Sequence, residues 1–360
     1  MLPDSFLPLW DPNDLKDTID LVRGVGADAE LKPPQRFLRS AARLLVKRLA
    51  RQVSDDPSEP AVIILDARDR DDELLRAFDF SLEPTLDQAV VSITGRIWLS
   101  NEKLAFGHFV THDRSGADLV DWVVRDLQLG DKPTVFFDPT VDGGELRFYP
   151  FGLSDLGQVT PYPVGAIHQV TYADARAVIE TVYVNSLVSP QHQIVSTWAK
   201  PSKHWAAKNA EEVVQGLIQV ALKSTFLFCE VDKEGPVRSG RFDLVLAYIE
   251  PVTGARTNYG VLELKALRSR GSTGAAYSTS ETKKIVSDGL VQAYQYRDNL
   301  SAMWAALCCF DLRMDADDMN DCISEVAQPA VDHQVTVDVW RLFNSSKRYR
   351  QHLDEVGATA

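Results

Sequence analysis

The chain has 360 residues, 45% of them hydrophobic and 25% charged, a composition typical of a globular protein long enough for two domains. Its formal net charge of −13 excludes a protein that coats nucleic acid through bulk electrostatic attraction. No apolar run is long enough to span a bilayer, and the N-terminal stretch MLPDSFLPLW lacks the features of a signal peptide, so we expect a cytoplasmic protein that binds no membrane.

The acidity is concentrated in the first part of the chain. Residues 1–200 hold 20 Lys and Arg against 30 Asp and Glu, whereas residues 201–360 hold 18 against 21. The four cysteines form no CxxC pair, and a chain of this length does not need a disulfide scaffold. We therefore expect reduced thiols.

Residues 1–195 are predicted to form a separate N-terminal domain of mixed α/β structure. Apolar spacing and start signals predict helices at 11–24, 33–53, 115–129 and 172–187. Short apolar runs predict strands at 61–67, 90–100, 104–112 and 133–138, with a hairpin around Asn101 and Glu102. The role of this domain is open between recognition and regulation, through a protein partner or a second copy of the chain.

The helix expected at 33–53 carries six cations and no acid. Four of them recur every four residues and form one face: Arg39, Arg43, Lys47 and Arg51. This face is a candidate to bind nucleic-acid phosphates or an acidic partner. The alternative is a face that is solvated or paired with the acids of its own domain.

A domain boundary is expected at Ser196–Trp205, around Pro201. Residues 201–345 then predict the order α-β-β-β-α-β, with helices at 209–224 and 279–299 and strands at 226–231, 241–250, 259–267 and 303–313. Ser278 and Glu281 have the spacing of a capping box at the start of the second helix. This order predicts an α/β domain in which helices cover a sheet, followed by a basic tail at 346–360.

Two of these strands carry isolated charges among apolar residues. In YGVLELKAL, Glu263 and Lys265 are two residues apart, so their side chains point to the same face. Asp243 is the lone acid of GRFDLVLAY, and pairing of the two strands brings it near Glu263. Two carboxylates at close range favour a shared cation, and oxygen ligands suit Mg²⁺ or Mn²⁺. The alternative is an internal Glu–Lys ion pair with an unrelated Asp.

The motifs GRFDLVL, VLELKA and, on the next helix, QAYQY together resemble the core of the PD-(D/E)xK nuclease superfamily, in its RecB-like branch with a QxxxY motif. The resemblance covers about residues 205–312. Phe242 stands in place of the proline that names the motif, a replacement that this superfamily tolerates. The resemblance implies a restriction-endonuclease-like α-β-β-β-α-β core with a central mixed sheet.

By this resemblance Asp243 and Glu263 are metal ligands, the Leu264 carbonyl is a possible further ligand, and Lys265 is the catalytic lysine. The implied cofactor is Mg²⁺ or Mn²⁺, and the implied activity is hydrolysis of phosphodiester bonds by a metal-dependent nuclease.

Three further residues complete the implied site. Members of the superfamily often add a metal-binding glutamate from the first helix, where both Glu211 and Glu212 qualify by position. Glu211 is preferred because it lies on the apolar stripe that should face the sheet. Gln292 and Tyr296, the QxxxY residues, would help to place the substrate or brace the site.

The resemblance favours DNA over RNA as substrate, and defence against mobile elements, restriction or repair as setting. Arg268 and Arg270, directly after the charged strand, join the basic helix as candidate nucleic-acid contacts. The competing hypothesis is a catalytically silent nuclease-fold module that binds nucleic acid or assembles a complex. Loss of Asp243, Glu263 or Lys265 would be the expected mark of such a module, and all three are present.

Overall fold

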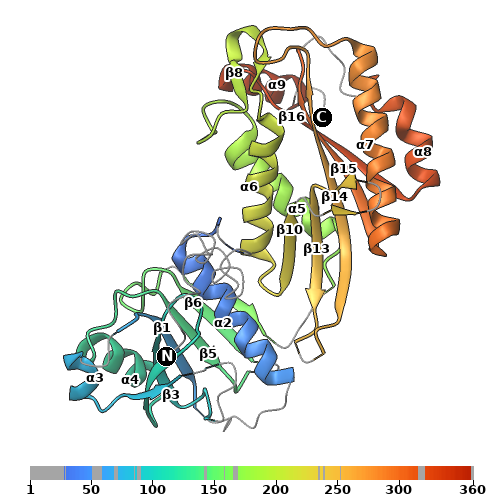
Figure 1. Cartoon of the computed structure of the whole chain (residues 1–360). Helices are drawn as coiled ribbons and strands as arrows, with labels where there is room; N and C mark the ends of the chain where they lie inside the picture. The colour runs from blue at the N-terminus through green and yellow to red at the C-terminus, as the bar shows by residue number, and fades with distance from the viewer. Residues whose placement is uncertain are drawn as a thin grey trace, which may run out of the picture. The chain divides into compact units, whose positions relative to one another are not determined.

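The chain divides into an N-terminal unit, Met1–Ile167, and a C-terminal unit, His168–Ala360 (Figure 1). The computed structural model describes residues 28, 30–50, 59–68, 72–84, 86, 91–141, 144–157, 159–164, 169–233, 236–237, 240–251, 253–314 and 321–357. The helix expected at 11–24 lies outside these residues. Within them, no helix has the length and apolar character needed to cross a membrane.

In the described part of the N-terminal unit, seven strands form one mixed sheet in the order β2-β4-β3-β1-β5-β6-β7. The strands are β1 (Ala61–Leu65), β2 (Ser81–Glu83), β3 (Arg96–Ser100), β4 (Gly107–Thr111), β5 (Thr134–Asp138), β6 (Glu145–Tyr149) and β7 (Thr160–Pro163). β1 is parallel to β3 and antiparallel to β5. β3 and β4 form the predicted hairpin, which is confirmed.

The helices of this unit are α2 (Pro33–Ala50), α3 (Glu73–Ala77) and α4 (Gly116–Asp121), and α4 continues into the π-helical turn η3 (Trp122–Asp126). Leu75, Leu119 and Val123 from α3, α4 and η3 pack on the face of the sheet that carries Val62 and Ile64. The predicted helix at 115–129 is thus confirmed, but it changes hydrogen-bonding pattern halfway.

Two residues of the basic face predicted on α2, Arg39 and Arg43, are paired with an acid of their own unit. The Arg39 side chain is buried and pairs with Asp28 at 3.4 Å, and Arg43 Nη1 lies 3.2 Å from the same carboxylate. A buried guanidinium cannot reach a phosphate, so the prediction is wrong for Arg39, and Arg43 is paired within its own unit. Lys47 is half-buried, and Arg51 lies outside the described residues.

In the described part of the C-terminal unit, five strands form a mixed sheet in the order β10-β13-β14-β15-β16. They are β10 (Cys229–Lys233), β13 (Leu244–Ile249), β14 (Arg256–Arg268), β15 (Trp304–Leu312) and β16 (Val335–Arg341). Pairing is antiparallel from β10 to β14 and parallel from β14 to β16.

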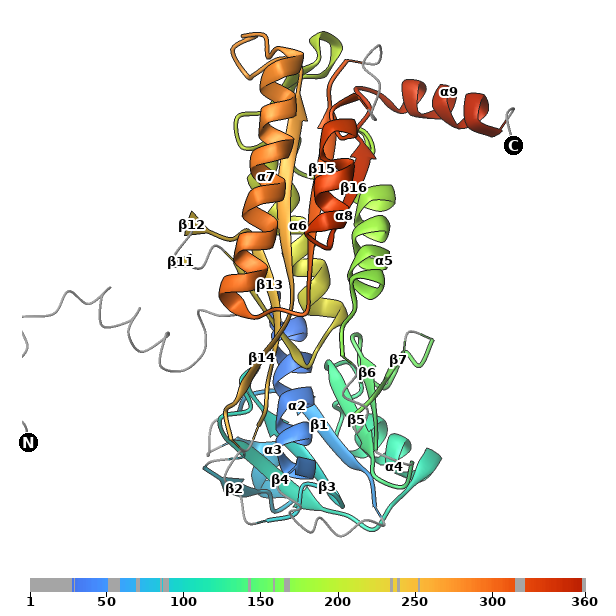
Figure 2. The same ribbon diagram turned by 90° about the vertical axis from the view of Figure 1, so that its right-hand side faces the viewer.

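Helices cover both faces of this sheet (Figure 2). The helices of this unit are α5 (Tyr172–Val182, continued by the π-helical turn η4, Tyr183–Leu187), α6 (Ala210–Thr225), α7 (Thr279–Leu300), α8 (Ala327–Asp332) and α9 (Ser346–Gly357). Short elements are β8 (Trp198–Lys200), η5 (Pro201–Lys203), β9 (Trp205–Ala206), β11 (Pro236–Val237), β12 (Gly240–Arg241) and η7 (Ser324–Val326). α5 and α6 pack on one face, and α7 with η7 and α8 on the other.

The predicted order of elements is confirmed as α6-β10-β13-β14-α7-β15, with the small hairpin β11-β12 inserted. α7 is the crossover that two parallel strands require. It begins at the predicted capping box, in which the Ser278 side chain accepts from the Glu281 N–H and the Glu281 carboxylate accepts from the Ser278 N–H at 2.6 Å. The predicted basic tail forms the helix α9.

The division between the units falls earlier than the boundary predicted at Ser196–Trp205. Ala175 and Ile179 of α5 are buried in the same core as Val214 and Ile218 of α6, so α5 belongs to the C-terminal unit. Pro201, which suggested a boundary, instead opens the turn η5 between β8 and β9. A proline marks a local break in regular structure, whereas membership of a unit depends on packing.

A fragment of residues 168–360 should melt cooperatively, because it carries the whole core around the five-stranded sheet. A fragment of 201–360 loses the buried side chains of α5, at a cost on the order of 5 kcal/mol. We expect circular dichroism to show a melting temperature lower by about 10 °C or more. Equal melting temperatures would place α5 outside this core.

Candidate active site

β14 extends beyond its neighbour β13, and this leaves part of one strand edge open. Pairing between the two strands ends at Leu244 and Leu262, whereas β14 continues to Arg268 with β15 on its other side. Peptide N–H groups on the open edge therefore have no strand partner there. Buried N–H groups need an acceptor, and here side-chain carboxylates provide it.

Asp243 and Glu211 bind this edge from two different elements. Asp243, just before β13, accepts a hydrogen bond at Oδ2 from the Leu264 N–H at 2.7 Å. Glu211, in the first turn of α6, accepts at Oε2 from the Ala266 N–H at 3.0 Å. N–H groups two residues apart in a strand point to the same side, so the two carboxylates lie along one edge.

α6 fixes this arrangement through one face. Glu211, which the sequence favoured over Glu212, is half-buried and lies at the strand edge, whereas Glu212 is exposed. Gln215, one turn later, is buried, and its Nε2 donates to the Asp243 carbonyl at 3.0 Å. Gln215 was not among the residues predicted from the sequence. Its four-residue spacing from Glu211 is the signal that places both on the same helix face.

Glu263 and Lys265 point to the face of the sheet that α7 covers. Val261, on the same strand face, packs in the core under α7, whereas Leu262 and Leu264 pack on the α6 side. The Glu263 side chain is 2% exposed and the Lys265 side chain 15%, and Lys265 Nζ donates to Glu263 Oε1. The shared face and the Glu–Lys ion pair, which was the alternative interpretation, are both present.

The charges around this pair are unbalanced. Burial raises the pKa of Glu263 to about 8, and the nearby charges of Asp243 and Glu211 add to the increase while Lys265 opposes it. Burial lowers the pKa of Lys265, but the three carboxylates outweigh it, so the net shift is upward. At neutral pH one protonated lysine therefore faces three carboxyl groups.

α7 runs antiparallel to β14 and covers Lys265. A Cβ atom added at Gly289 would lie 3.1 Å from Lys265 Cε, so the lysine stem passes directly beneath the helix. At the far end of the helix, Asn258 Nδ2 donates to the Leu300 carbonyl at 2.7 Å. Gln292, which lies between these two contacts and one turn from Gly289, is therefore at about the level of Glu263.

Two buried oxygens near this level have no hydrogen-bond partner within the described residues: Glu263 Oε2 and Gln292 Oε1. An unsatisfied buried acceptor costs about 1–3 kcal/mol, and two acceptors cannot satisfy each other without a proton or a cation between them. Tyr296, one turn further along α7, is buried in the apolar core on this face. Of the two QxxxY residues, Gln292 is thus the one with an unpaired polar group.

Oxygen atoms dominate the possible ligands of this site. Asp243 and Glu263 offer carboxylates, and the Leu264 carbonyl should share the open edge with the Leu264 N–H, because both groups of a strand residue point the same way. Such donors suit Mg²⁺ or Mn²⁺. Among the described residues, no three His, Cys, Asp or Glu side chains form a ready-made metal cluster.

Arg268 and Arg270 follow the carboxylate edge directly. Both are half-buried, and each donates at 3.4 Å to a carbonyl: Arg268 to Ala207, and Arg270 to Gly274. Neither contact neutralises the positive charge, so both arginines keep it available beside the site.

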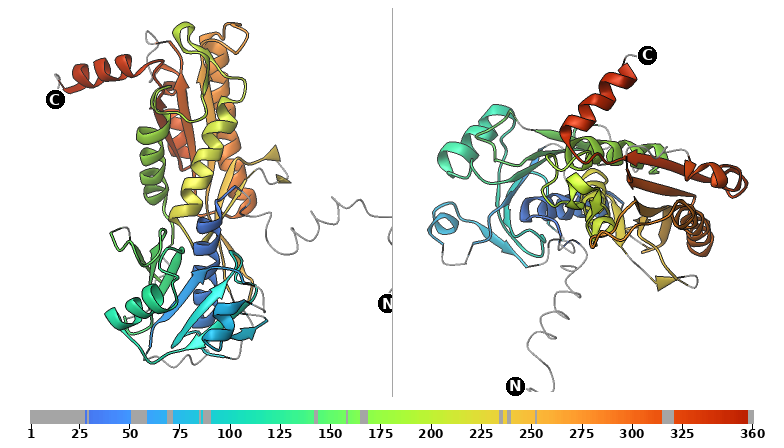
Figure 3. Two further views of the ribbon diagram at one scale, coloured as in Figure 1. Left: turned by 90° about the vertical axis from the view of Figure 1, so that its left-hand side faces the viewer. Right: turned by 90° about the horizontal axis from the view of Figure 1, so that it is seen from above.

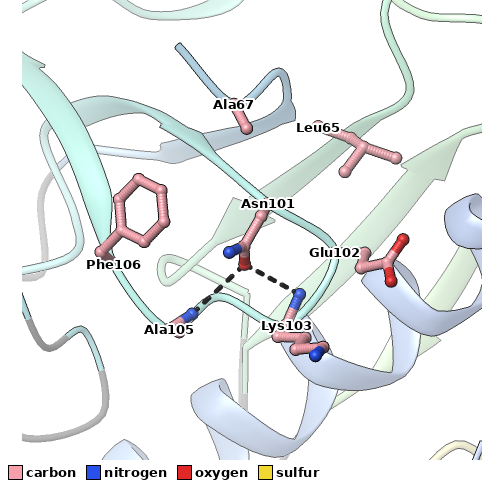
Figure 4. Close-up of a pocket in the computed structure, with 7 residues that line it drawn as sticks. All are labelled: Leu65, Ala67, Asn101, Glu102, Lys103, Ala105 and Phe106. Carbon is pink, nitrogen blue, oxygen red and sulfur yellow. Dashed lines mark hydrogen bonds between the residues drawn. The ribbon is translucent and has the colours of Figure 1, made fainter. Parts of the chain in front are cut away.

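A recess in the N-terminal unit lies where β1 and β3 end, and Figure 4 shows its lining. Asn101 Oδ1 accepts from the N–H groups of Lys103 and Ala105, and Glu102 pairs with Arg36 at 3.1 Å. Its main polar groups are thus engaged within the chain, which distinguishes this recess from the edge of β14.

No family model, curated protein or solved structure matches the chain. Function must therefore be inferred from the chemistry of the site.

The raised pKa of Glu263 predicts a pH-dependent loss of stability. The folded state holds this proton up to about pH 8, whereas the unfolded chain releases it near 4.5, so the free energy of unfolding falls as pH rises through this window. In the wild type, urea unfolding with EDTA present should show the free energy of unfolding fall by roughly 2–5 kcal/mol across this pH window. Glu263→Gln should not show this decrease. Glu212→Gln, the exposed control, should keep the wild-type slope. Identical slopes in all three proteins would show that Glu263 titrates normally.

Proposed function

We propose that the C-terminal unit is a metal-dependent nuclease that hydrolyses phosphodiester bonds. The observation that carries the proposal is the open edge of β14, where Asp243 and Glu211 bind alternate N–H groups beside the buried Glu263–Lys265 pair. The order α6-β10-β13-β14-α7-β15 supports a restriction-endonuclease-like core, as in the PD-(D/E)xK superfamily. By analogy with that superfamily, DNA is favoured over RNA.

Mg²⁺ or Mn²⁺ is the proposed cofactor, held by Asp243, Glu263 and the Leu264 carbonyl. Burial and the neighbouring carboxylates raise the Glu263 pKa, and the residues fit such an ion because a cation there would favour the ionised carboxylate and would give Glu263 Oε2 a partner. When bound, it would polarise the phosphate and lower the pKa of a bound water.

Lys265 is the residue proposed to act on the reacting atoms. Once Glu263 takes a metal, the lysine ammonium is free to donate to the attacking water or to a phosphate oxygen. Negative charge grows on the phosphate in the transition state, so this contact contributes more there than in the ground state. Gly289 allows the lysine stem to lie under α7, and Gln292 Oε1 is an acceptor for a water or a substrate group.

The ion pair itself favours a second function. Lys265 occupies Glu263 Oε1, an oxygen that a metal would use, and a closed pair suits a catalytically silent module that binds nucleic acid or assembles a complex. The two functions can be distinguished by experiment, because only the nuclease requires a divalent metal and cleaves the nucleic acid that it binds.

Metal titration tests the ligands. Asp243→Asn removes a carboxylate charge but keeps an oxygen that can accept from the Leu264 N–H, so the fold should persist. We expect calorimetry with Mn²⁺ to show at least a tenfold loss of affinity, because a neutral amide is a weaker ligand for a hard cation. Glu212→Gln should bind as the wild type does. Undiminished binding by Asp243→Asn would place the metal elsewhere.

Cleavage assays test the lysine. Lys265→Ala should retain the fold but lose cleavage by roughly a hundredfold or more, as for one preorganised electrostatic contact. Lys265→Arg should not rescue fully, since a guanidinium is larger and planar. The substrates are single- and double-stranded DNA and RNA with Mg²⁺ or Mn²⁺, and EDTA is the blank.

Lys284→Ala, an exposed lysine on α7, is the matched control and should cleave like the wild type. The catalytic proposal fails if Lys265→Ala is as active as this control, or if the wild type cleaves none of the substrates.

A further inference from the structure

Three segments of the C-terminal unit contain no acidic residue: 181–210, 264–280 and 339–353. With 51 Asp and Glu in 360 residues, an even distribution would place about nine in these segments. Instead they hold ten cations: Lys200, Lys203, Lys208, Lys265, Arg268, Arg270, Arg341, Lys347, Arg348 and Arg350. In a chain with a net charge of −13, these three segments thus carry cations and no acid.

Contacts hold the first two segments together. The Ala206 N–H donates to the Arg270 carbonyl at 3.1 Å, and Trp205 forms a β-bridge with Arg270. Arg268 Nη1 donates to the Ala207 carbonyl at 3.4 Å. The loop that follows β14 therefore lies against the segment that leads into α6.

The third segment joins the same end of the unit. Asn344 Nδ2 lies 3.0 Å from His204 Nε2, and the Ser346 N–H donates to Gln191 Oε1 at 2.9 Å. α9, which begins at Ser346, lies at the same end as β8 (Figure 1) and projects away from the rest of the unit (Figure 3). The acid-free segments thus form one basic end of the C-terminal unit.

Trp205 provides a fixed ring on this basic end. Lys200 Nζ and Lys203 Nζ lie 4.5 Å and 5.4 Å from the centre of its ring. The ring rests against the loop after β14, because a Cβ atom at Gly274 would lie 2.4 Å from Trp205 Cζ2. The side chain is half-buried, and both lysines are exposed.

Positive charge on this end is available to a ligand. Lys200, Lys203 and Lys208 are exposed, as are Lys347 and Arg350 on α9. Within the part of the chain that the structure describes, none of these five forms an ion pair with a carboxylate. Exposed cations that form no salt bridge attract a polyanion more strongly than cations already paired with carboxylates.

The basic end adjoins the candidate active site. Arg268 lies two residues beyond Ala266, whose N–H binds Glu211. On the other side, Lys208 lies two residues before the start of α6, which carries Glu211. A chain of phosphates on this surface would therefore run toward the carboxylate edge of β14.

We propose that the basic end binds a single-stranded nucleic acid and leads its backbone to the edge of β14. Lys200, Lys203 and Lys208 hold the phosphates, and the Trp205 ring stacks on an unpaired base once the two lysines above it turn to phosphates. A duplex keeps its bases paired and offers the ring no such face. The inference rests on the proposed function, because it names the form of the substrate and its path to that site.

Binding is measured by fluorescence anisotropy with a short single-stranded DNA in EDTA, so that no cleavage occurs. The Lys200→Gln, Lys203→Gln, Lys208→Gln triple variant should lose at least tenfold in affinity. The slope of log affinity against log salt should fall by about 2, as for three phosphate contacts on a single strand. The matched control neutralises three cations elsewhere, Arg125, Lys132 and Lys284, and should bind like the wild type.

Two further variants sharpen the test. Trp205→Leu should weaken binding of single-stranded DNA about tenfold and leave binding of duplex DNA unchanged. The triple variant should need at least tenfold more DNA than the matched control for half-maximal cleavage, whereas Lys265→Ala should bind DNA normally without cleaving it. The wild type could fail to cleave any substrate while the triple variant still loses DNA binding. That result would contradict the nuclease proposal and support the proposal that the basic end binds nucleic acid.

Affinity and salt slope equal to the control in the triple variant would overturn the proposal. Equal losses of single-stranded and duplex binding in Trp205→Leu would overturn its single-strand preference. Binding to vesicles of anionic lipid is measured as well, because Ile194 and Val195 in the first acid-free segment are exposed apolar residues that a membrane could also bind. Vesicle binding that the triple variant loses, with DNA binding unaffected, would assign the surface to membranes and contradict the proposal.

Discussion

The burial of Glu263 beside Lys265 is the constraint on which the rest of the site depends. A carboxyl group that is 2% exposed inside an apolar layer must be protonated, paired with a cation or bound to a metal. The chain supplies a lysine two residues away, and burial raises the pKa of Glu263 to about 8. Two apolar residues would serve a purely structural role at lower cost, and this difference favours the proposed metal site over packing alone.

The neighbouring elements are arranged around that pair. β13 stops pairing at Leu244, which leaves the N–H groups of Leu264 and Ala266 to the carboxylates of Asp243 and Glu211. These carboxylates also raise the pKa of Glu263. The same two residues that complete the strand edge therefore make the ionised form of Glu263 less stable unless a cation is bound nearby. A glycine at 289 then lets α7 close over the lysine stem.

Local sequence patterns predicted most of this site because side chains alternate every two residues along a strand and recur about every four residues on a helix face. Strand alternation placed Glu263 and Lys265 on one face, and the apolar stripe of α6 distinguished Glu211 from Glu212. Gln215 was missed because a polar residue on a helix is assigned outward by pattern. Its burial depends on the Asp243 carbonyl, which lies 28 residues further along the chain. Arg39 shows the same limit, since its partner Asp28 lies outside the helix.

The order of elements in the C-terminal unit was also predictable, but the limits of the units were not. The segment around Pro201 carries strong turn signals, and these describe only the local backbone. α5 belongs to the C-terminal unit because Ala175 and Ile179 share a core with α6, a contact that no local pattern records. The helical form of α9 and the meeting of the three acid-free segments likewise depend on contacts between distant residues.

A crystal soaked with Mn²⁺ and measured at the manganese absorption edge tests the central claim most directly. We expect an anomalous peak about 2.1 Å from carboxylate oxygens of Asp243 and Glu263, with Lys265 Nζ displaced from Glu263. An intact Glu263–Lys265 pair without such a peak, at a Mn²⁺ concentration that saturates binding in solution, would contradict it.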